Sequence, residues 1–200
     1  MKRIALTGGI GTGKTHVLRM IRRNGIPTLD ADQVSRAVVD LGQPAHHTLR
    51  QYFGDDYFLP NQQVNRPALA NLIFDNQAAR AKLESIVHPA IRRLIDDWFA
   101  RCADTNRTTV AIAEIPLLYE TNRAQMFDSV IVVSCAPKMQ VTRVINRDKL
   151  SALDAQNRLA AQLPMAQKIT AASWVVRTDG SNTETAQQVD RLCLALQNEQ

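Results

Sequence analysis

Residues 8–15 read GGIGTGKT and match the pattern G-x-x-x-x-G-K-(S/T). They follow a short apolar run, 3–7, and precede 16–23, whose apolar residues are spaced for a helix with one apolar face. Such a loop, between a strand and a helix, lets the backbone approach an anion closely and aims N–H groups at a phosphate. The sequence therefore predicts a nucleoside triphosphate site in which Lys14 reaches the outer phosphates and Thr15 holds Mg²⁺.

The chain has 200 residues, which suits a single α/β domain with an insertion, and its net charge is +5 with a pI of about 9.4. A net positive charge suits binding of a phosphate-rich ligand and would also suit binding of nucleic acid. The Lys and Arg residues are spread along the chain without a long basic block. A nucleic-acid partner is therefore not predicted.

Three widely spaced cysteines, an odd number without a C-x-x-C pair, indicate neither a zinc site nor a disulfide framework. The N-terminus leads directly into the first predicted strand, so no signal peptide is expected, and no apolar stretch is long enough to span a membrane. We expect a cytoplasmic protein that does not bind a membrane and is a monomer or a weak homo-oligomer.

Four further runs alternate with helical patterns and predict the remaining strands of a five-stranded parallel sheet: 26–29, 108–113, 128–134 and 173–176. Helical periodicity fills 44–103 and predicts a helical insertion between the second and third strands, in which Pro89 begins or kinks a new helix. Helices in 137–170 carry arginines and occupy the place where nucleotide kinases keep a lid. The GTPase motifs N-K-x-D and D-x-x-G are missing from the sequence.

Acidic residues follow two predicted strands. Asp30 and Asp32 come directly after the second strand, where one carboxylate could accept the proton of an attacking hydroxyl and the other could cap a helix or bind a metal-held water. Alternatively, Asp30 is a plain cap and Asp32 is solvated; beside the glycine-rich loop, we favour the functional interpretation for Asp32. Glu114 could position Mg²⁺, or it could be an ordinary loop residue.

Arg143 and Arg147 are four residues apart and share a helix face. Arginine can stabilise charge on a transferring phosphoryl group through paired hydrogen bonds, which favours a functional role over a merely solvated basic face.

The chain resembles the dephospho-CoA kinase family over nearly its full length. Beyond the loop, the resemblance rests on Asp30-Ala31-Asp32, His88-Pro89, Pro116-Leu117-Leu118-Tyr119-Glu120, and the array of Gln140, Arg143, Arg147, Arg158 and Gln162. It implies a three-layer P-loop kinase fold, with a parallel sheet, a helical substrate-binding insertion and a lid. It also implies transfer of the γ-phosphoryl group of ATP to the ribose 3′-hydroxyl of dephospho-CoA, the final step of coenzyme A synthesis.

The same resemblance assigns roles to residues. Asp32 would be the general base, Lys14 the phosphate clamp, Thr15 the Mg²⁺ ligand and Arg143 the lid arginine. The residues implied to bind ATP are Gly11, Thr12, Gly13, Lys14, Thr15, His16 and Arg147. Those implied to bind the acceptor are Asp32, Arg66, His88, Leu117 and Glu120. The chain departs from the family pattern at Ala37, where an acid is usual, and at Thr178, where an asparagine is expected near the adenine.

Overall fold

A computed structural model describes residues 1–105 and 108–198. The chain forms two compact units. The first unit comprises residues 1–30 and 99–200, and the second comprises residues 31–98.

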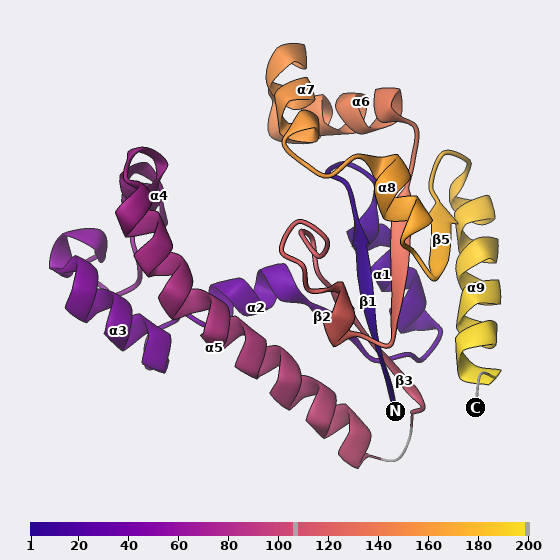
Figure 1. Cartoon of the computed structure of the whole chain (residues 1–200), viewed down its shortest axis with the longest axis horizontal. Coiled ribbons are helices and arrows are strands. Elements are labelled where there is room, and N and C mark those ends of the chain that lie inside the picture. The colour runs from indigo at the N-terminus through magenta and orange to yellow at the C-terminus, as the bar shows by residue number, and fades with distance from the viewer. Residues whose placement is uncertain (106–107, 199–200) are drawn as a thin grey trace. The chain divides into compact units, whose positions relative to one another are not determined.

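The first unit is built on a parallel sheet with the strand order β2-β3-β1-β4-β5 (Figure 1). Its strands are β1 (Lys2–Gly8), β2 (Thr28–Asp30), β3 (Val110–Glu114), β4 (Ser129–Ser134) and β5 (Trp174–Arg177). Because β1 lies between β3 and β4, the loop that leaves its carboxyl end is flanked by the segments that leave the ends of those two strands. This edge of an open parallel sheet is where ligands of α/β proteins bind.

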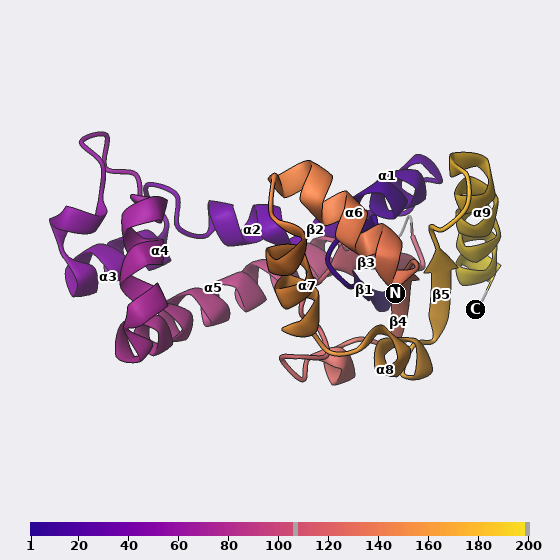
Figure 2. The same cartoon turned by 90° about the horizontal axis from the view of Figure 1, so that it is seen from above.

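Helices cover both faces of this sheet. The helices that lie wholly in the first unit are α1 (Lys14–Arg23), α6 (Pro137–Asp148), α7 (Ala152–Ala160), α8 (Met165–Thr170) and α9 (Asn182–Asn198), and a 3₁₀ turn spans Ala124–Met126. Helices α1 and α9 lie on one face of the sheet and α8 lies on the other (Figure 2). The predicted α/β class with five parallel strands in a three-layer arrangement is confirmed.

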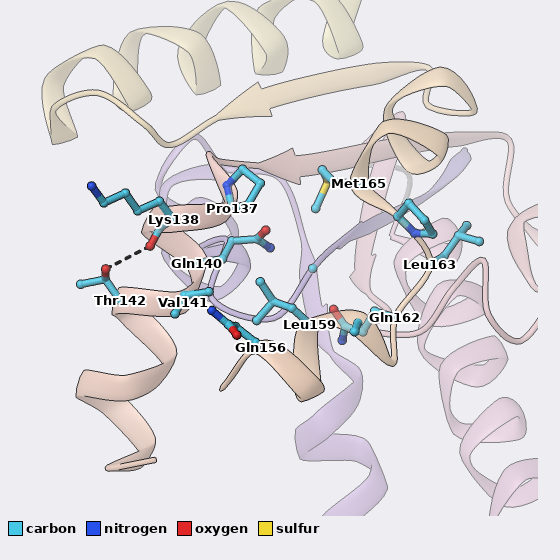
Figure 3. A pocket seen from close by; sticks show the side chains of 13 residues that line it. Pro137, Lys138, Gln140, Val141, Thr142, Gln156, Leu159, Gln162, Leu163 and Met165 are labelled. Carbon is cyan, nitrogen blue, oxygen red and sulfur yellow. Dashed lines mark hydrogen bonds between the residues drawn. The ribbon is translucent and has the colours of Figure 1, made fainter. Parts of the chain in front are cut away.

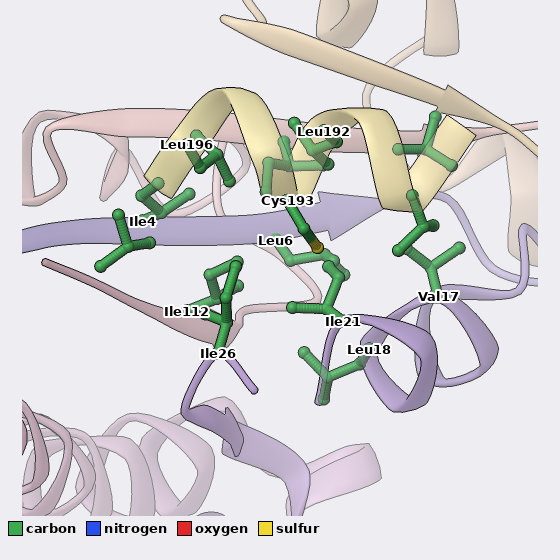
Figure 4. Packing of buried hydrophobic residues seen from close by; sticks show 14 of the residues in the cluster. Ile4, Leu6, Val17, Leu18, Ile21, Ile26, Ile112, Leu192, Cys193 and Leu196 are labelled. Carbon is green, nitrogen blue, oxygen red and sulfur yellow. The ribbon is translucent and has the colours of Figure 1, made fainter. Parts of the chain in front are cut away.

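The core of the first unit lies between the sheet and the pair α1 and α9. Figure 4 shows Leu192, Cys193 and Leu196 of α9 facing Ile4 and Leu6 of β1, all of them buried. Their spacing on α9 is the helical repeat that lets one face meet a sheet. This packing fixes the direction in which α1 leaves the glycine-rich loop.

The second unit is helical and has its own apolar core. It contains α2 (Ala31–Ala37), α3 (Pro44–Phe53), a 3₁₀ turn (Asp55–Tyr57), α4 (Arg66–Asp75) and most of α5 (Gln77–Asp104), whose last residues belong to the first unit. A new helix does not begin at Pro89, because α5 continues through it. Apolar residues on both sides of Pro89, among them Ile86 and Ile91, pack on the unit's core, which offsets the backbone hydrogen bond that the proline cannot make.

Strand ends differ from the predicted ones by at most two residues, and the difference matters at two positions. Asp30 is the last residue of β2 and Glu114 the last residue of β3, and the two are paired in the sheet register. Glu114 is almost fully buried, so the alternative of an ordinary loop residue is wrong. Pairing with β1 extends β3 by one residue beyond the apolar run, because Glu114 is the register partner of Leu6.

Thiol reactivity provides a test of this core. Burial raises the pKa of the Cys193 thiol to about 11, and Cys135 is also buried, whereas Cys102 is half-exposed. We expect Cys102 to react with an aromatic disulfide reagent at pH 8 well before the other two. All three thiols should react once the chain is unfolded in guanidinium chloride. Equally fast reaction of three thiols in the folded protein would contradict the packing of α9.

Candidate active site

The glycine-rich loop joins β1 to α1 and is held close to its neighbours. A Cβ atom on Gly8 would collide with the Val133 carbonyl of β4, and one on Gly11 would lie 2.8 Å from the Gln140 carbonyl oxygen. Gly11 also has a φ of 75°, which favours glycine. Both positions therefore require the residue that they have.

The N-terminus of α1 completes this loop. Gly13 precedes the helix in a left-handed conformation, and the first turn of α1 contains no acidic residue. The first N–H groups of a helix have no partner within it, and the helix dipole adds a partial positive charge there. The loop and the helix start therefore form a site for an anion.

The side chains of the loop and of the first turn of α1 differ in their burial and in their hydrogen-bond partners. Lys14 Nζ donates to the carbonyl oxygens of Gly8 (3.2 Å) and Gly9 (2.9 Å). Thr12 is fully buried and its hydroxyl donates to the Gly9 carbonyl at 2.9 Å, so its side chain is engaged within the loop. Thr15 and His16 are exposed in the first turn of α1.

Two carbonyl groups of the loop accept hydrogen bonds from outside it. Arg143 Nη1 donates to Gly11 O at 3.3 Å, and the Thr178 hydroxyl donates to Thr12 O at 2.7 Å. Arg143 is further bonded to Thr178 through Nη1–Oγ1 at 3.0 Å and Nη2–O at 2.8 Å. The Thr178 N–H donates to Ser134 O at 2.9 Å, which ties the group to β4. Arg143 thus connects the loop to the segment that follows β5.

The carbonyl that precedes these two, that of Ile10, is held in the same way. Gln140 of α6 donates from Nε2 to Ile10 O at 3.0 Å, and the Ile10 N–H donates to Gln162 Oε1 at 2.8 Å. Both glutamines line a cavity of about 640 Å³ beside the loop (Figure 3). The carbonyls of Ile10, Gly11 and Thr12 therefore all bond to side chains outside the loop.

Arg147 lies one turn beyond Arg143, in different surroundings. Its guanidinium forms two hydrogen bonds with Asp148, at 2.7 and 3.0 Å, and Arg158 of α7 contacts the same carboxylate at 3.3 Å. The hydrogen bonds from Arg147 hold the pKa of Asp148 below its usual value. The two predicted arginines therefore have different partners in this structure: Arg143 holds the loop, and Arg147 bonds to Asp148 at the end of α6, which Arg158 joins to α7.

Glu120 forms an ion pair that reaches into the protein interior. Its Oε1 accepts from Lys168 Nζ of α8 at 2.5 Å and from the Leu163 N–H at 3.0 Å, and the Lys168 side chain is fully buried. Burial alone would raise the pKa of Glu120, but these hydrogen bonds and the Lys168 charge lower it below its usual value. The neighbouring Tyr119 hydroxyl donates to Ala171 O at 3.0 Å, whereas Leu117 is exposed. Glu120 therefore anchors the segment after β3 to the region of α8.

The carboxyl edge of the sheet brings Asp30 and Glu114 together, because they are register partners on β2 and β3. Asp32 follows Asp30 by two residues, in the first turn of α2, and is exposed. Two residues of chain span at most about 7 Å, so the backbone at Asp32 stays near this edge.

Oxygen ligands of this kind suit Mg²⁺, which is commonly held by one or two protein oxygens together with substrate phosphates and water. No cluster of three or more His, Cys, Asp or Glu occurs among residues 1–105 and 108–198, so an all-protein metal cage is not formed there.

Arg66 and His88 both belong to the second unit. They line a cavity of about 280 Å³ whose walls also include Ser35 and Glu84, together with apolar side chains of α3, α4 and α5. Arg66 Nη2 donates to the Arg36 carbonyl at 3.0 Å. The structure thus places these two predicted acceptor ligands in one cavity.

Comparison with known proteins decides the family. The family model described as dephospho-CoA kinase matches residues 2–184. The chain belongs to the dephospho-CoA kinase family. The curated dephospho-CoA kinase of Hydrogenovibrio crunogenus is 40% identical over 179 residues, covering 90% of both chains, and that of Geobacter sulfurreducens is 38% identical over 194 residues, covering 96% of this chain and 97% of the relative.

Solved structures agree on the fold. The crystal structure of TT1252 from Thermus thermophilus has a TM-score of 0.83 and 29% identity, covering 97% of this chain and 96% of the other. Dephospho-CoA kinase from Campylobacter jejuni has a TM-score of 0.75 at 22% identity, covering 98% and 96%. Shikimate kinase from Acinetobacter baumannii shares the fold alone, with a TM-score of 0.54 at 16% identity, covering 100% and 96%. The predicted family resemblance is confirmed.

Three features of this dephospho-CoA kinase family member were not predicted from its sequence. Thr178 departs from the family pattern and has no role predicted from the sequence. In the structure it is buried, and its hydroxyl donates to the Thr12 carbonyl of the loop. Lys168 gave no signal, because a lysine in a short helix normally lies in solvent. Gln162 is one of the residues that carry the family resemblance, but no local pattern in the sequence indicates that its side chain reaches Ile10.

Within the residues that the structure describes, none of the helices combines the length and the apolar character needed to cross a membrane.

Replacing Glu120 should test its anchoring role. We expect Glu120→Gln to lower the free energy of unfolding by about 3 kcal/mol at pH 7, because the buried Lys168 ammonium loses its counter-ion. The folded pKa of Glu120 is lowered, so its contribution is complete above about pH 4.5 and declines as the pH falls and the carboxyl takes up a proton. Urea denaturation of both proteins at pH 7 and below pH 4.5 measures this. A raised KM for the acceptor without loss of stability would instead indicate a residue that contacts the substrate.

Replacing Arg143 should test its hold on the loop. We expect Arg143→Lys to weaken ATP binding by about tenfold, because one ammonium cannot reproduce the fork that joins Gly11 to Thr178. Calorimetric titration with ATP measures the affinity, and Arg191→Lys on the exposed face of α9 is a matched control. Unchanged affinity would show that the hydrogen bonds of Arg143 do not shape the site.

Proposed function

We propose that this chain transfers the γ-phosphoryl group of ATP to the ribose 3′-hydroxyl of dephospho-CoA and produces coenzyme A and ADP, the final step of coenzyme A synthesis. The observation that carries the proposal is the glycine-rich loop, whose carbonyls bond outward to Gln140, Arg143 and Thr178. Membership of the dephospho-CoA kinase family over residues 2–184 supplies the acceptor.

The loop would receive the phosphates of ATP. In the proposal, the backbone N–H groups from Gly11 to Thr15 surround the phosphate chain and His16 lies at its margin. The Lys14 ammonium, now on the Gly8 and Gly9 carbonyls, turns to the β- and γ-phosphates. Arg147 would also bind ATP, by exchanging Asp148 for a phosphate. Positive charge fixed before the reaction stabilises the charge that develops on the transferring group.

Magnesium fits the donors at this site. The Thr15 hydroxyl would hold the ion directly, and the carboxylates of Asp30 and Glu114 would hold its water ligands. Bound there, Mg²⁺ would neutralise phosphate charge so that an oxygen nucleophile can approach.

The second unit would bind the acceptor. Its cavity combines four polar side chains, those of Arg66, His88, Ser35 and Glu84, with apolar walls, which suits a ligand that carries both polar groups and an apolar arm. The exposed Leu117 of the first unit is a further proposed contact. Glu120 would contribute indirectly, by fixing the segment that carries Leu117.

Asp32 would act as the general base. It is exposed, and chain connectivity keeps it close to the edge at which the phosphates bind. Its carboxylate would accept the proton of the 3′-hydroxyl as that oxygen attacks the γ-phosphorus, and ADP would leave on the opposite side.

A coupled assay tests the proposal. Purified protein with ATP, Mg²⁺ and dephospho-CoA should form ADP and coenzyme A in equal amounts. Turnover with a nucleoside monophosphate or another small alcohol, but not with dephospho-CoA, would identify a different small-molecule kinase. Turnover with neither, together with salt-dependent binding of nucleic acid, would contradict the predicted absence of a nucleic-acid partner. The predicted monomer or weak homo-oligomer can be checked by light scattering in the same preparation.

Replacing Asp32 should separate chemistry from binding. We expect Asp32→Asn to lower kcat by about 100-fold or more and to leave the affinity for ATP within about threefold, because the amide cannot take a proton. Asp40→Asn, at an exposed position after α2, is the matched control and should retain full activity. A wild-type kcat in Asp32→Asn would remove the residue from the mechanism.

A further inference from the structure

Ile10 is bonded at both of its backbone groups by side chains far away in the sequence. The N–H group donates to Gln162 Oε1 at 2.8 Å, and the carbonyl accepts from Gln140 Nε2 at 3.0 Å. Gln140 lies on α6, and Gln162 lies in the segment between α7 and α8, on different sides of the cavity in Figure 3. The loop is therefore connected to both arms of the region that was predicted to form a lid.

The chemistry of the backbone fixes which amide atom each glutamine presents. A peptide N–H can only donate, so Gln162 must present its oxygen to Ile10. A peptide carbonyl can only accept, so Gln140 must present its nitrogen. The two residues are chemically identical, but they have opposite roles and should respond differently to the same substitution.

Close packing holds the Gln140 amide in place. A Cβ atom on Gly9 would lie 2.5 Å from Gln140 Nε2 and 3.0 Å from Met165 Cε. Gln140 itself is buried. The amide nitrogen thus lies between the backbone at Gly9 and the Ile10 carbonyl and has little room to choose another partner.

We infer that Gln140 and Gln162 are positioning residues that hold the loop in the shape that binds ATP, Gln140 as an obligatory donor and Gln162 as an obligatory acceptor. The inference rests on the proposed function, because it concerns the same nucleotide site. It adds two residues that need not touch ATP and that connect α6 and the segment between α7 and α8 to the loop.

Replacing each glutamine by glutamate distinguishes the two roles. Gln162→Glu keeps an oxygen that accepts from the Ile10 N–H, so we expect its ATP affinity to stay within about threefold of wild type. Gln140→Glu directs a carboxylate oxygen at a carbonyl oxygen, so we expect its affinity to fall by about tenfold to 100-fold. The two variants have the same net charge, and each therefore controls for the added negative charge of the other.

Gln156 provides a matched control in the same cavity. It is exposed on α7, and among the residues that the structure describes it has no hydrogen bond to the loop. We expect Gln156→Glu to bind ATP as the wild type does. Thermal unfolding of each variant shows whether it is folded. If Gln140→Glu does not fold, Gln140→Leu removes the same donor without adding a charge, and its affinity for ATP should also fall by about fivefold or more.

A pH series gives a readout that a purely structural role would not move. When the carboxyl introduced by Gln140→Glu takes up a proton, it can donate to the Ile10 carbonyl again. The affinity of this variant relative to wild type should therefore recover as the pH falls from 8 to 5, whereas that of Gln162→Glu should not improve. Titration with ATP and Mg²⁺ at several pH values measures this.

The outcomes separate the two proposals. Equal ATP affinities for Gln140→Glu, Gln162→Glu and wild type, or equal losses without recovery at low pH, would overturn the assigned roles of the glutamines and leave the proposed function standing. Wild-type protein that binds no ATP would overturn both. Wild-type protein that binds ATP but does not phosphorylate dephospho-CoA would overturn the proposed function alone, because the affinities would still test the loop.

Discussion

Hydrogen bonds on the outer side of the glycine-rich loop are the constraint on which the site depends. Glycine residues give this loop conformational freedom. If the ligand had to order a flexible loop, the lost conformational entropy would weaken binding. Three successive carbonyls are bonded by Gln140, Arg143 and Thr178, which come from α6 and from the segment after β5. With its carbonyls held outward, the loop can present its N–H groups to phosphate without first being rearranged.

The strand order places these partners within reach. Because β1 is central, the segment after β4 becomes α6 on one side of the loop, and β3 ends on the other side with Glu114. The next strand outward on each side adds a further residue, Thr178 after β5 and Asp30 at the end of β2. Residues separated by more than 160 positions thus meet at one edge, since all five strands point the same way.

Features with a local cause could be predicted from the sequence, whereas features that depend on distant partners could not. The glycine-rich loop follows from neighbouring residues, and so does the start of α7, where Ser151 Oγ accepts from the Asp154 N–H at 3.1 Å. Pro89 shows the limit of local rules, because packing in the second unit keeps α5 continuous through it. Lys168 shows the same limit for charge, since its burial depends on Glu120, 48 positions earlier. The roles of Asp32, Arg66 and His88 stay predictions.

The Glu120–Lys168 pair also determines where the chain can bend. It fastens the start of α8 to the segment after β3, while Gln140 and Arg143 fasten the start of α6 to the loop. The ion pair of Asp148 with Arg158 joins the end of α6 to α7. Movement of α7 over a bound nucleotide would therefore have to break one of these contacts or bend the chain between them.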